Sequence, residues 1–180
     1  MTKNMKIGNI LISREEINKK VKELGALISN DYKGEEIIAV GILKGCFVFM
    51  SDIIREITTD VQTYFMQVSS YGSGTESSGE IHIKKDIDVD ICGKDVIIFE
   101  DIIDSGNTLS VLVPMLKERG PNSVKVCTLL SKPSRRMVEF EADYTGFEIP
   151  DKFIIGYGLD CDEKFRQLPY IAEVVIDDDI

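Results

Sequence analysis

The residues whose types are best suited to binding or catalysis lie where an apolar run leads into a group of acids. Val96–Phe99 is a short apolar segment that predicts a buried strand, and Glu100, Asp101 and Asp104 follow it. Open α/β sheets bind ligands beyond the carboxyl ends of their strands. We therefore expect these carboxylates to lie in a binding site, although Asp104 could instead only cap the helix that follows.

The turn after these acids predicts a site for phosphate. Gly106 permits a positive φ, so successive backbone N–H groups and two hydroxyls can point at one spot. A helix expected from residue 108 adds the positive end of its dipole. We expect a phosphate monoester to bind to the five residues of this turn, which are Asp104, Ser105, Gly106, Asn107 and Thr108.

The two adjacent acids are suited to a sugar. Glu100 and Asp101 point to opposite sides of an extended backbone, yet both lie close to the turn. Carboxylates are poor partners for phosphate, but they accept hydrogen bonds from vicinal hydroxyls and bind Mg²⁺. They could therefore hold the 2- and 3-hydroxyls of a ribose directly or through metal-bound water. The acids and the turn together indicate a ribose 5-phosphate.

The elements that position these groups alternate between strand and helix. Such alternation implies a mostly parallel sheet with right-handed crossovers. We expect an α/β fold, a mostly parallel twisted sheet flanked by helices, in a single domain over residues 1–180. The expected strands are 37–43, 61–68, 95–99, 124–130, one near Tyr144, 153–157, 171–176 and an antiparallel edge at 81–91; helices are expected after a capping box at Ser13 and Glu16, at 47–57 and at 108–119.

Two segments carry signals against regular structure. Residues 69–79 are rich in Ser and Gly and have too little apolar surface to order themselves, which predicts a mobile loop. Pro114 falls inside the expected 108–119 helix, and we expect it to kink that helix or to confine it to its later part.

Composition limits the kinds of partner and the location that we expect for this protein. The formal net charge of −10 disfavours nucleic acid as a primary partner, because its phosphates would be repelled. The longest apolar stretch, 37–43, is far shorter than the ~18 residues of a membrane span, and no leader-like segment opens the sequence. The four cysteines are far apart, and we expect reduced, buried thiols in a cytoplasmic protein.

The segment EDIIDSGNT at 100–108 closely resembles the signature with which type I phosphoribosyltransferases bind 5-phosphoribosyl-1-pyrophosphate (PRPP). Four further motifs occur in the matching order, and together the five resemble the hypoxanthine-guanine branch of that family. These motifs are Leu43-Lys44-Gly45, Ser70-Tyr71-Gly72, Ser131-Lys132-Pro133 and Gly156-Tyr157-Gly158-Leu159-Asp160. The resemblance runs from about residue 10 to residue 175.

The resemblance implies an activity and a shape. The activity is magnesium-dependent transfer of the phosphoribosyl group from PRPP to hypoxanthine or guanine, with release of pyrophosphate. The fold would carry a small hood formed by the termini and a mobile lid loop, in which Ser70 and Tyr71 cover the reacting centre so that water cannot capture it. Members of this branch usually form homodimers or homotetramers, and the apolar residues of 44–49 could serve such an interface.

The resemblance also implies roles for particular residues. Asp104 would act near N7 of the purine as general acid/base, or would stabilise positive charge on the ribose; the sequence does not separate the two. A cis peptide would join Leu43 to Lys44. The pyrophosphate would be held by Leu43, Lys44, Gly45 and Arg166, the purine by Lys132, Phe153, Ile154 and Asp160, and Mg²⁺ by Glu100, Asp101 and Asp160.

Some of these assignments have plainer alternatives. Lys44 could be an ordinary surface lysine, and Phe153 begins an apolar segment, so it could belong to the core. Arg135 and Arg136 form a basic pair, for which we expect a solvated surface position rather than a catalytic role.

Other functions fit part of the pattern. A PRPP-sensing regulator with the same fold would bind nucleic acid or a protein partner. An acidic-pocket phosphatase or receiver-like domain would also use acids at a strand end. A closer alternative is a transferase for another base, such as xanthine, adenine or orotate.

Overall fold

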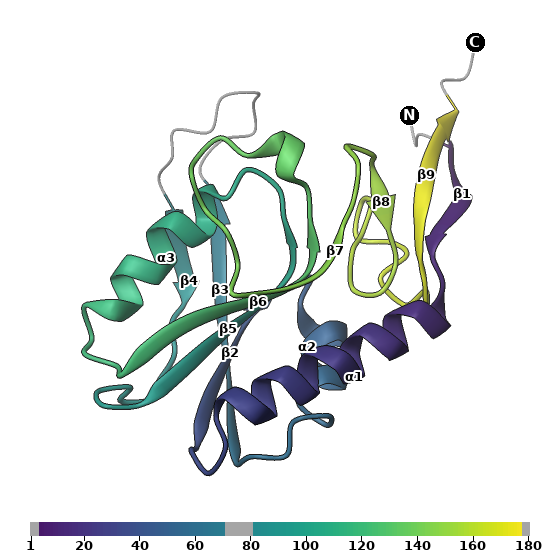
Figure 1. The fold of residues 1–180 in the computed structure, drawn as a ribbon. Helices are drawn as coiled ribbons and strands as arrows, with labels where there is room; N and C mark the ends of the chain where they lie inside the picture. The colour runs from purple at the N-terminus through teal and green to yellow at the C-terminus, as the bar shows by residue number, and fades with distance from the viewer. Residues whose placement is uncertain (1–3, 71–80, 178–180) are drawn as a thin grey trace.

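The computed structural model describes residues 4–70 and 81–177, and its main sheet runs in the order β4-β3-β2-β5-β6-β7 (Figure 1). Strands β3, β2, β5, β6 and β7 are parallel to their neighbours, and β4 pairs with β3 in the antiparallel direction. This is the predicted mostly parallel sheet. The strands are β2 (Ile37–Leu43), β3 (Val61–Ser70), β4 (Ile81–Lys85), β5 (Asp95–Ile103), β6 (Ser123–Ser131) and β7 (Tyr144–Glu148).

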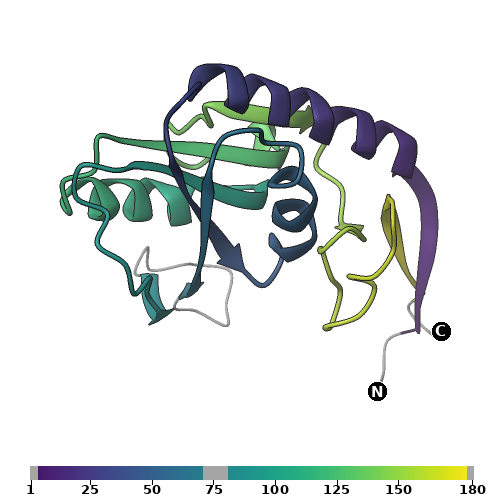
Figure 2. The same cartoon turned by 90° about the horizontal axis from the view of Figure 1, so that it is seen from below.

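Helices cover both faces of this sheet. Helices α1 (Arg14–Asp31) and α2 (Phe47–Ile53) pack on one face, and α3 (Asn107–Lys117) packs on the other (Figures 1 and 2). Strand β2 shows why: Ile37 and Ala39 belong to the apolar cluster beneath α1 and α2, whereas Ile38 and Val40 belong to the cluster beneath α3. Successive side chains of a strand point to opposite faces, so a continuous apolar run serves both layers.

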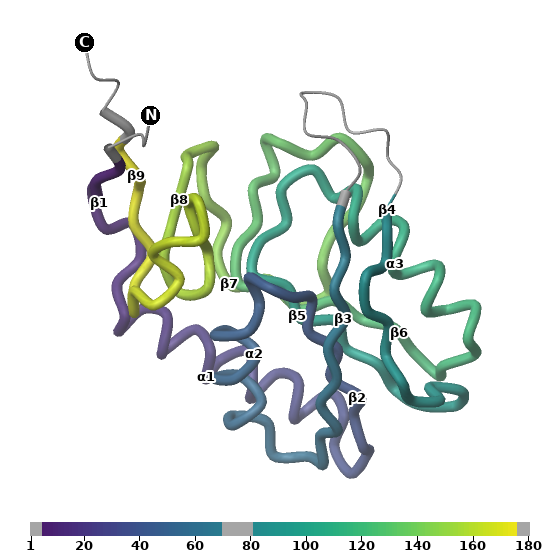
Figure 3. The backbone as a smooth tube through the Cα atoms, turned by 180° about the vertical axis from the view of Figure 1, so that it is seen from behind, coloured from purple at the N-terminus to yellow at the C-terminus, as the bar shows by residue number. Residues whose placement is uncertain are grey.

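A second, antiparallel sheet forms the hood. It consists of β1 (Asn4–Ile12), β9 (Ile171–Asp177) and β8 (Ile154–Ile155), in the order β1-β9-β8. The two ends of the described chain therefore lie side by side at this end of the molecule (Figure 3). Helix α1 follows β1 after a single residue and links the hood to the main sheet (Figure 2).

Strand β1 was not predicted from the sequence. It pairs only with β9, and Ile7 and Ile10 on it are largely exposed, so the usual burial pattern is absent. Three predicted elements are also shorter than expected: α2 ends at Ile53, β4 ends at Lys85, and only 154–155 form a strand within 153–157. Ile57, Ile87 and Ile91 beyond these ends are nevertheless buried, because irregular backbone also packs on the core.

One of the two alternatives predicted for Pro114, and the predicted burial of two cysteines, are wrong. Helix α3 begins at Asn107 and continues through Pro114, so the proline does not confine it to its later part. Burial of Leu109, Leu112 and Leu116 favours the helix despite the lost backbone hydrogen bond. All four cysteines are free thiols, but Cys92 is exposed and Cys161 only half-buried.

No helix among the described residues is both long enough and apolar enough to cross a membrane.

Candidate active site

The parallel strands bring the predicted site residues to one edge of the main sheet. Strand β5 lies between β2 and β6, so the residues that follow their carboxyl ends become neighbours (Figure 1). Lys44 and Lys132 directly follow β2 and β6, and Glu100 lies in the last part of β5, which ends at Ile103. Motifs that are separated by more than twenty residues in the sequence thus meet at this edge.

The turn after β5 has the conformation predicted for a phosphate site. Gly106 has φ +82° and precedes the first residue of α3, so the helix N-terminus opens into the turn. The Ser105 hydroxyl accepts a hydrogen bond from the N–H of Asn107 at 3.3 Å. A small pocket occupies this position, and its lining includes Glu100, Asp104, Ser105, Gly106 and Thr108.

The two adjacent acids face different parts of the site, as expected. Glu100 lines the pocket of the turn, whereas Asp101 packs against Gly45 in the loop after β2. A Cβ at position 45 would lie 1.7 Å from Asp101 Oδ2, so only glycine fits there without moving the carboxylate. Asp101 therefore joins the ribose side of the site to the Lys44-Gly45 loop.

Burial raises the pKa of both acids, and it leaves one oxygen of Glu100 without a partner among the described residues. Glu100 Oε2 is buried and has no hydrogen-bond partner among the described residues. Burial, reinforced by the neighbouring Asp101, raises the pKa of Glu100 well above its ordinary value. Burial also raises the pKa of Asp101 to about 6, although the N–H of Ile102 donates to its Oδ1 at 2.9 Å. A cation or a pair of hydroxyls would satisfy these groups, so the residues fit bound Mg²⁺ or ribose.

Asp104 and Lys132 face each other across the site. Lys132 follows β6, its side chain is almost fully buried, and its Nζ lies 3.4 Å from Asp104 Oδ1. The pair lacks hydrogen-bond geometry, and Asp104 Oδ1 is a buried oxygen without such a partner among the described residues. An ammonium donor and a carboxylate acceptor thus stand next to the phosphate turn.

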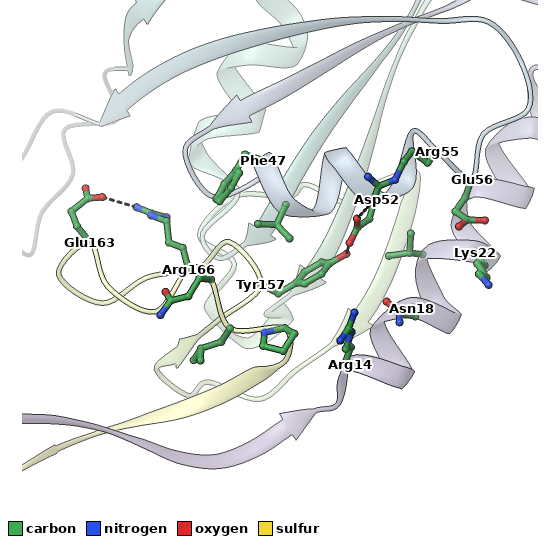
Figure 4. A pocket seen from close by; sticks show the side chains of 15 residues that line it. Arg14, Asn18, Lys22, Phe47, Asp52, Arg55, Glu56, Tyr157, Glu163 and Arg166 are labelled. Atoms are coloured by element: carbon green, nitrogen blue, oxygen red, sulfur yellow. Dashed lines mark hydrogen bonds and ion pairs between the residues drawn. The ribbon is translucent and has the colours of Figure 1, made fainter.

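The cations expected to bind pyrophosphate are already paired with carboxylates. The peptide between Leu43 and Lys44 is cis, as the resemblance implied. Lys44 Nζ lies 2.9 Å from Glu163 Oε1, and Arg166 Nη2 lies 2.8 Å from Asp160 Oδ1. Arg166 also pairs with Glu163 (Figure 4). Arg166 Nη1 also donates to the Gly158 carbonyl at 2.7 Å.

Asp160, which is predicted to bind Mg²⁺, is paired within its own loop. Besides Arg166, it binds the N–H of Glu163 through Oδ2 at 2.8 Å. Residues 4–70 and 81–177 contain no group of three or more His, Cys, Asp or Glu side chains poised to hold a metal ion. Asp160 is thus an ion-pair partner of Arg166 in this structure.

A larger cavity lies between α1, α2 and the loop 157–169 (Figure 4). The hydroxyl of Tyr157 crosses it and donates to Asp52 Oδ2 at 2.6 Å, which ties the loop to α2. The cavity shares Glu163 and Arg166 with the site but includes none of the acids of β5. We therefore assign the reacting groups to the edge of β5 and not to this larger cavity.

The hood brings an aromatic side chain to the surface. Phe153 is 58% exposed, so it does not belong to the core and is available for stacking. Ile154 is buried and pairs with Glu173 of β9. Ser70 is the last residue of β3, and Tyr71 lies outside the described residues.

Two residues at the site were not predicted. Glu163 was overlooked because an exposed acid in an irregular loop gives no sequence signal. Arg136 was expected at a solvated surface, but it is half-buried and its guanidinium binds the carbonyls of Ile103 and Asp104 at 2.7 and 2.6 Å. Its position four residues after Lys132 was the available signal.

Comparison with known proteins agrees with this geometry. Residues 11–162 match the model of the phosphoribosyl transferase domain. The chain therefore belongs to the phosphoribosyltransferase family, with the type I fold.

Its relatives place it within one branch of that family. A hypoxanthine-guanine phosphoribosyltransferase of Bacillus subtilis is 53% identical over 92% of both chains, and one of Streptococcus pneumoniae is 52% identical with the same coverage. A crystal structure of such an enzyme from Bacillus anthracis superposes with a TM-score of 0.90 at 50% identity, covering 96% of this chain and all of the other. The chain is accordingly a transferase of purine salvage, which favours this function over the regulator and the phosphatase-like alternatives.

Proposed function

We propose that residues 1–180 form one transferase domain that joins hypoxanthine or guanine to the phosphoribosyl group of PRPP, giving IMP or GMP and pyrophosphate. The observation that carries this proposal is the position of Asp104. It is the first residue of the phosphate turn, and its Oδ1 lies 3.4 Å from Nζ of the buried Lys132. The turn would hold the 5-phosphate of the ribose, and Lys132 would donate to the carbonyl oxygen of a 6-oxopurine. Asp104 lies between these two positions, close to where the bond between ribose and base would form.

The turn at 104–108 would hold the 5-phosphate through its backbone N–H groups and hydroxyls. Glu100 and Asp101 would hold the ribose hydroxyls, directly or through Mg²⁺, and the unpartnered oxygen of Glu100 supports this role. Mg²⁺ supplies charge neutralisation on the pyrophosphate when it is bound. Asp160 remains the third acid proposed to reach a metal, and it would have to leave Arg166 to do so.

Lys132 would select the base, because an ammonium only donates and therefore suits the O6 of hypoxanthine and guanine. Phe153 would stack on the ring, and the backbone of Ile154 would contact its far edge. Asp104 would hold the proton at N7 or stabilise positive charge on the ribose while the bond from C1 to pyrophosphate breaks and the bond to N9 forms.

Leu43, Lys44, Gly45 and Arg166 would hold the departing pyrophosphate, and Ser70 with Tyr71 would help to cover the reaction. We also propose a cytoplasmic homo-oligomer. Phe47, in the apolar segment 44–49, is 43% exposed and offers an apolar contact for a second copy.

A spectrophotometric assay tests this function. The protein is supplied with PRPP, Mg²⁺ and, in turn, hypoxanthine, guanine, xanthine and adenine. We expect turnover with hypoxanthine or guanine, and in Asp104→Asn a fall in kcat of roughly 10²- to 10⁴-fold with PRPP binding retained. Turnover of adenine alone would contradict the proposed base, and an unchanged kcat in the variant would remove Asp104 from the chemical step.

A further inference from the structure

Arg136, in the segment 132–137 that packs against the phosphate turn, has no role in the function proposed above. Three consecutive carbonyls at the start of the turn, those of Ile103 at the end of β5 and of Asp104 and Ser105, all accept hydrogen bonds from residues 132–137. The N–H of Lys132 donates to the Ile103 carbonyl at 2.9 Å, and the N–H of Met137 donates to the Ser105 carbonyl at 3.0 Å. Arg136 Nη1 donates to the first two of these carbonyls at 2.7 and 2.6 Å.

The guanidinium of Arg136 is itself held in place. Its Nη2 donates to Ser131 Oγ at 2.7 Å, and its Nε donates to the Phe140 carbonyl at 3.0 Å. All three of its nitrogens therefore have acceptors. A guanidinium keeps its charge at any ordinary pH, and its planar fork can bind several acceptors at fixed angles.

This arrangement determines where the N–H groups of the turn point. Within a trans peptide, the N–H is directed opposite to the preceding carbonyl. Because the carbonyls of residues 103–105 face Arg136 and its segment, the N–H groups of residues 104–106 face away from it. None of these three N–H groups has an acceptor among residues 4–70 and 81–177, which leaves them available for a phosphate.

We propose that Arg136 is a positioning residue: it orients the backbone of the phosphate turn and the main chain of Asp104, and so sets the affinity for the 5-phosphate of PRPP and of the nucleotide product. It does so without contacting either substrate. This inference rests on the proposed function, because it assumes that the turn binds the phosphate of a ribose phosphate.

The test compares Arg136→Ala and Arg136→Lys with a matched control, Arg135→Ala. Arg135 is exposed and pairs with Asp151 at 3.4 Å, so its removal should leave the kinetics unchanged. Lysine keeps the charge at position 136 but has no fork. We therefore expect both Arg136 variants to raise the KM for PRPP and the Kd for GMP by roughly 10- to 100-fold.

Two readouts distinguish positioning from a general loss of structure. The inhibition constant of pyrophosphate, which lacks the 5-phosphate, should change by less than about threefold, and millimolar guanidinium should partly restore PRPP affinity to Arg136→Ala but not to Arg135→Ala. If Arg136→Ala does not fold, Arg136→Lys and Ser131→Ala, which removes one acceptor of the guanidinium, provide the same comparison.

The inference is overturned if a folded Arg136 variant keeps the KM for PRPP within twofold of the parent. It is also overturned if the constants for PRPP, GMP and pyrophosphate all weaken equally. Failure of the proposed function would look different, because the unaltered protein would then not convert PRPP and a purine base.

Discussion

The two regions proposed to bind anions, on either side of β5, use different groups: backbone N–H groups in one and side-chain cations in the other. On the side of Glu100, the phosphate turn offers backbone N–H groups whose orientation is maintained by hydrogen bonds from residues 132–137. On the side of Asp101, the groups proposed to bind pyrophosphate are the side chains of Lys44 and Arg166, which are paired with carboxylates of the loop 157–166.

The difference matches the fate of the two anions. The 5-phosphate is present in both the substrate and the nucleotide product, so a rigid backbone site serves the whole cycle. Pyrophosphate must leave, and side-chain cations with alternative carboxylate partners can exchange it. The Lys44–Glu163 pair is exposed, and such pairs contribute little free energy, so it would not prevent this exchange; the Arg166–Asp160 pair is more buried.

Among the variants that test this comparison, we expect the largest effect from adding a methyl group at Gly45, where the loop after β2 contacts Asp101. In Gly45→Ala, the new Cβ would lie 1.7 Å from Asp101 Oδ2 and would force that carboxylate out of place. We expect kcat/KM for PRPP to fall by at least ~100-fold, because steric misplacement of this size acts directly on the reacting geometry.

Gly34→Ala is the matched control for this change. Gly34 has φ +84° and open space around its Cβ position, so alanine should cost about 1 kcal/mol of stability without affecting kinetics. Steady-state kinetics on both variants measures the contrast. A Gly45→Ala enzyme within fivefold of the parent would show that Asp101 moves without consequence.

A second prediction concerns the buried acid between the regions. The pKa of Asp101 is raised to about 6 by burial, so the folded protein takes up its proton more readily than the unfolded chain. The stability that this group contributes is present below the unfolded pKa of about 3.9 and is lost as the pH rises through about 6. Asp101→Asn should therefore stabilise the ligand-free protein at pH 8 by on the order of 1 to 3 kcal/mol, and hardly at all near pH 4.

Urea unfolding at both pH values, without PRPP or Mg²⁺, measures this effect. Asp88→Asn removes the same charge from an exposed position and should show no comparable gain. The same Asp101→Asn protein should bind PRPP less tightly, because a carboxamide is a weaker partner for Mg²⁺ and ribose. A pH-independent gain in stability would rule out the buried charge as its cause.

The smallest expected effect concerns Glu163. Its carboxylate contacts both Lys44 and Arg166, and the hydrogen bond from Lys44 holds the pKa of Glu163 below its ordinary value. In Glu163→Gln these cations lose a competing charge, so the inhibition constant of pyrophosphate should fall by roughly two- to fivefold. Glu118→Gln, an equal charge change at a distant exposed site, is the control; weaker inhibition in Glu163→Gln would mean that Glu163 assists binding instead.

Much of the main sheet and of its carboxyl edge could be predicted from the sequence. Short runs such as Ile37–Leu43 are apolar at every position, which is typical of parallel strands that are buried on both faces. The positive φ of Gly106 and the helix that follows it were likewise readable, because they depend on local chemistry within a few residues. The motifs around Lys44 and Lys132 were placed by resemblance, and the topology brings them to the edge of β5.

Contacts between distant or irregular segments could not be predicted in this way. Strand β1 pairs with β9, which is more than 150 residues away in the chain. The sequence predicted a solvated surface position for Arg136, because it lies next to Arg135. The packing of residues 132–140 against the phosphate turn instead directs its side chain inward. The roles of Asp160 and Glu163 depend on a loop with positive φ at Asp162, Glu163 and Phe165, which no periodic pattern describes.

The pairing of β1 with β9 makes recognition of the base depend on distant parts of the chain. Ile154, proposed to contact the purine, lies in β8, which pairs with β9, and β9 pairs with β1. The phosphate turn and the segment that binds its carbonyls both lie within residues 103–137. A change in β1 could therefore reach the base through two strand pairings, whereas the phosphate turn is shaped by one continuous stretch of the chain.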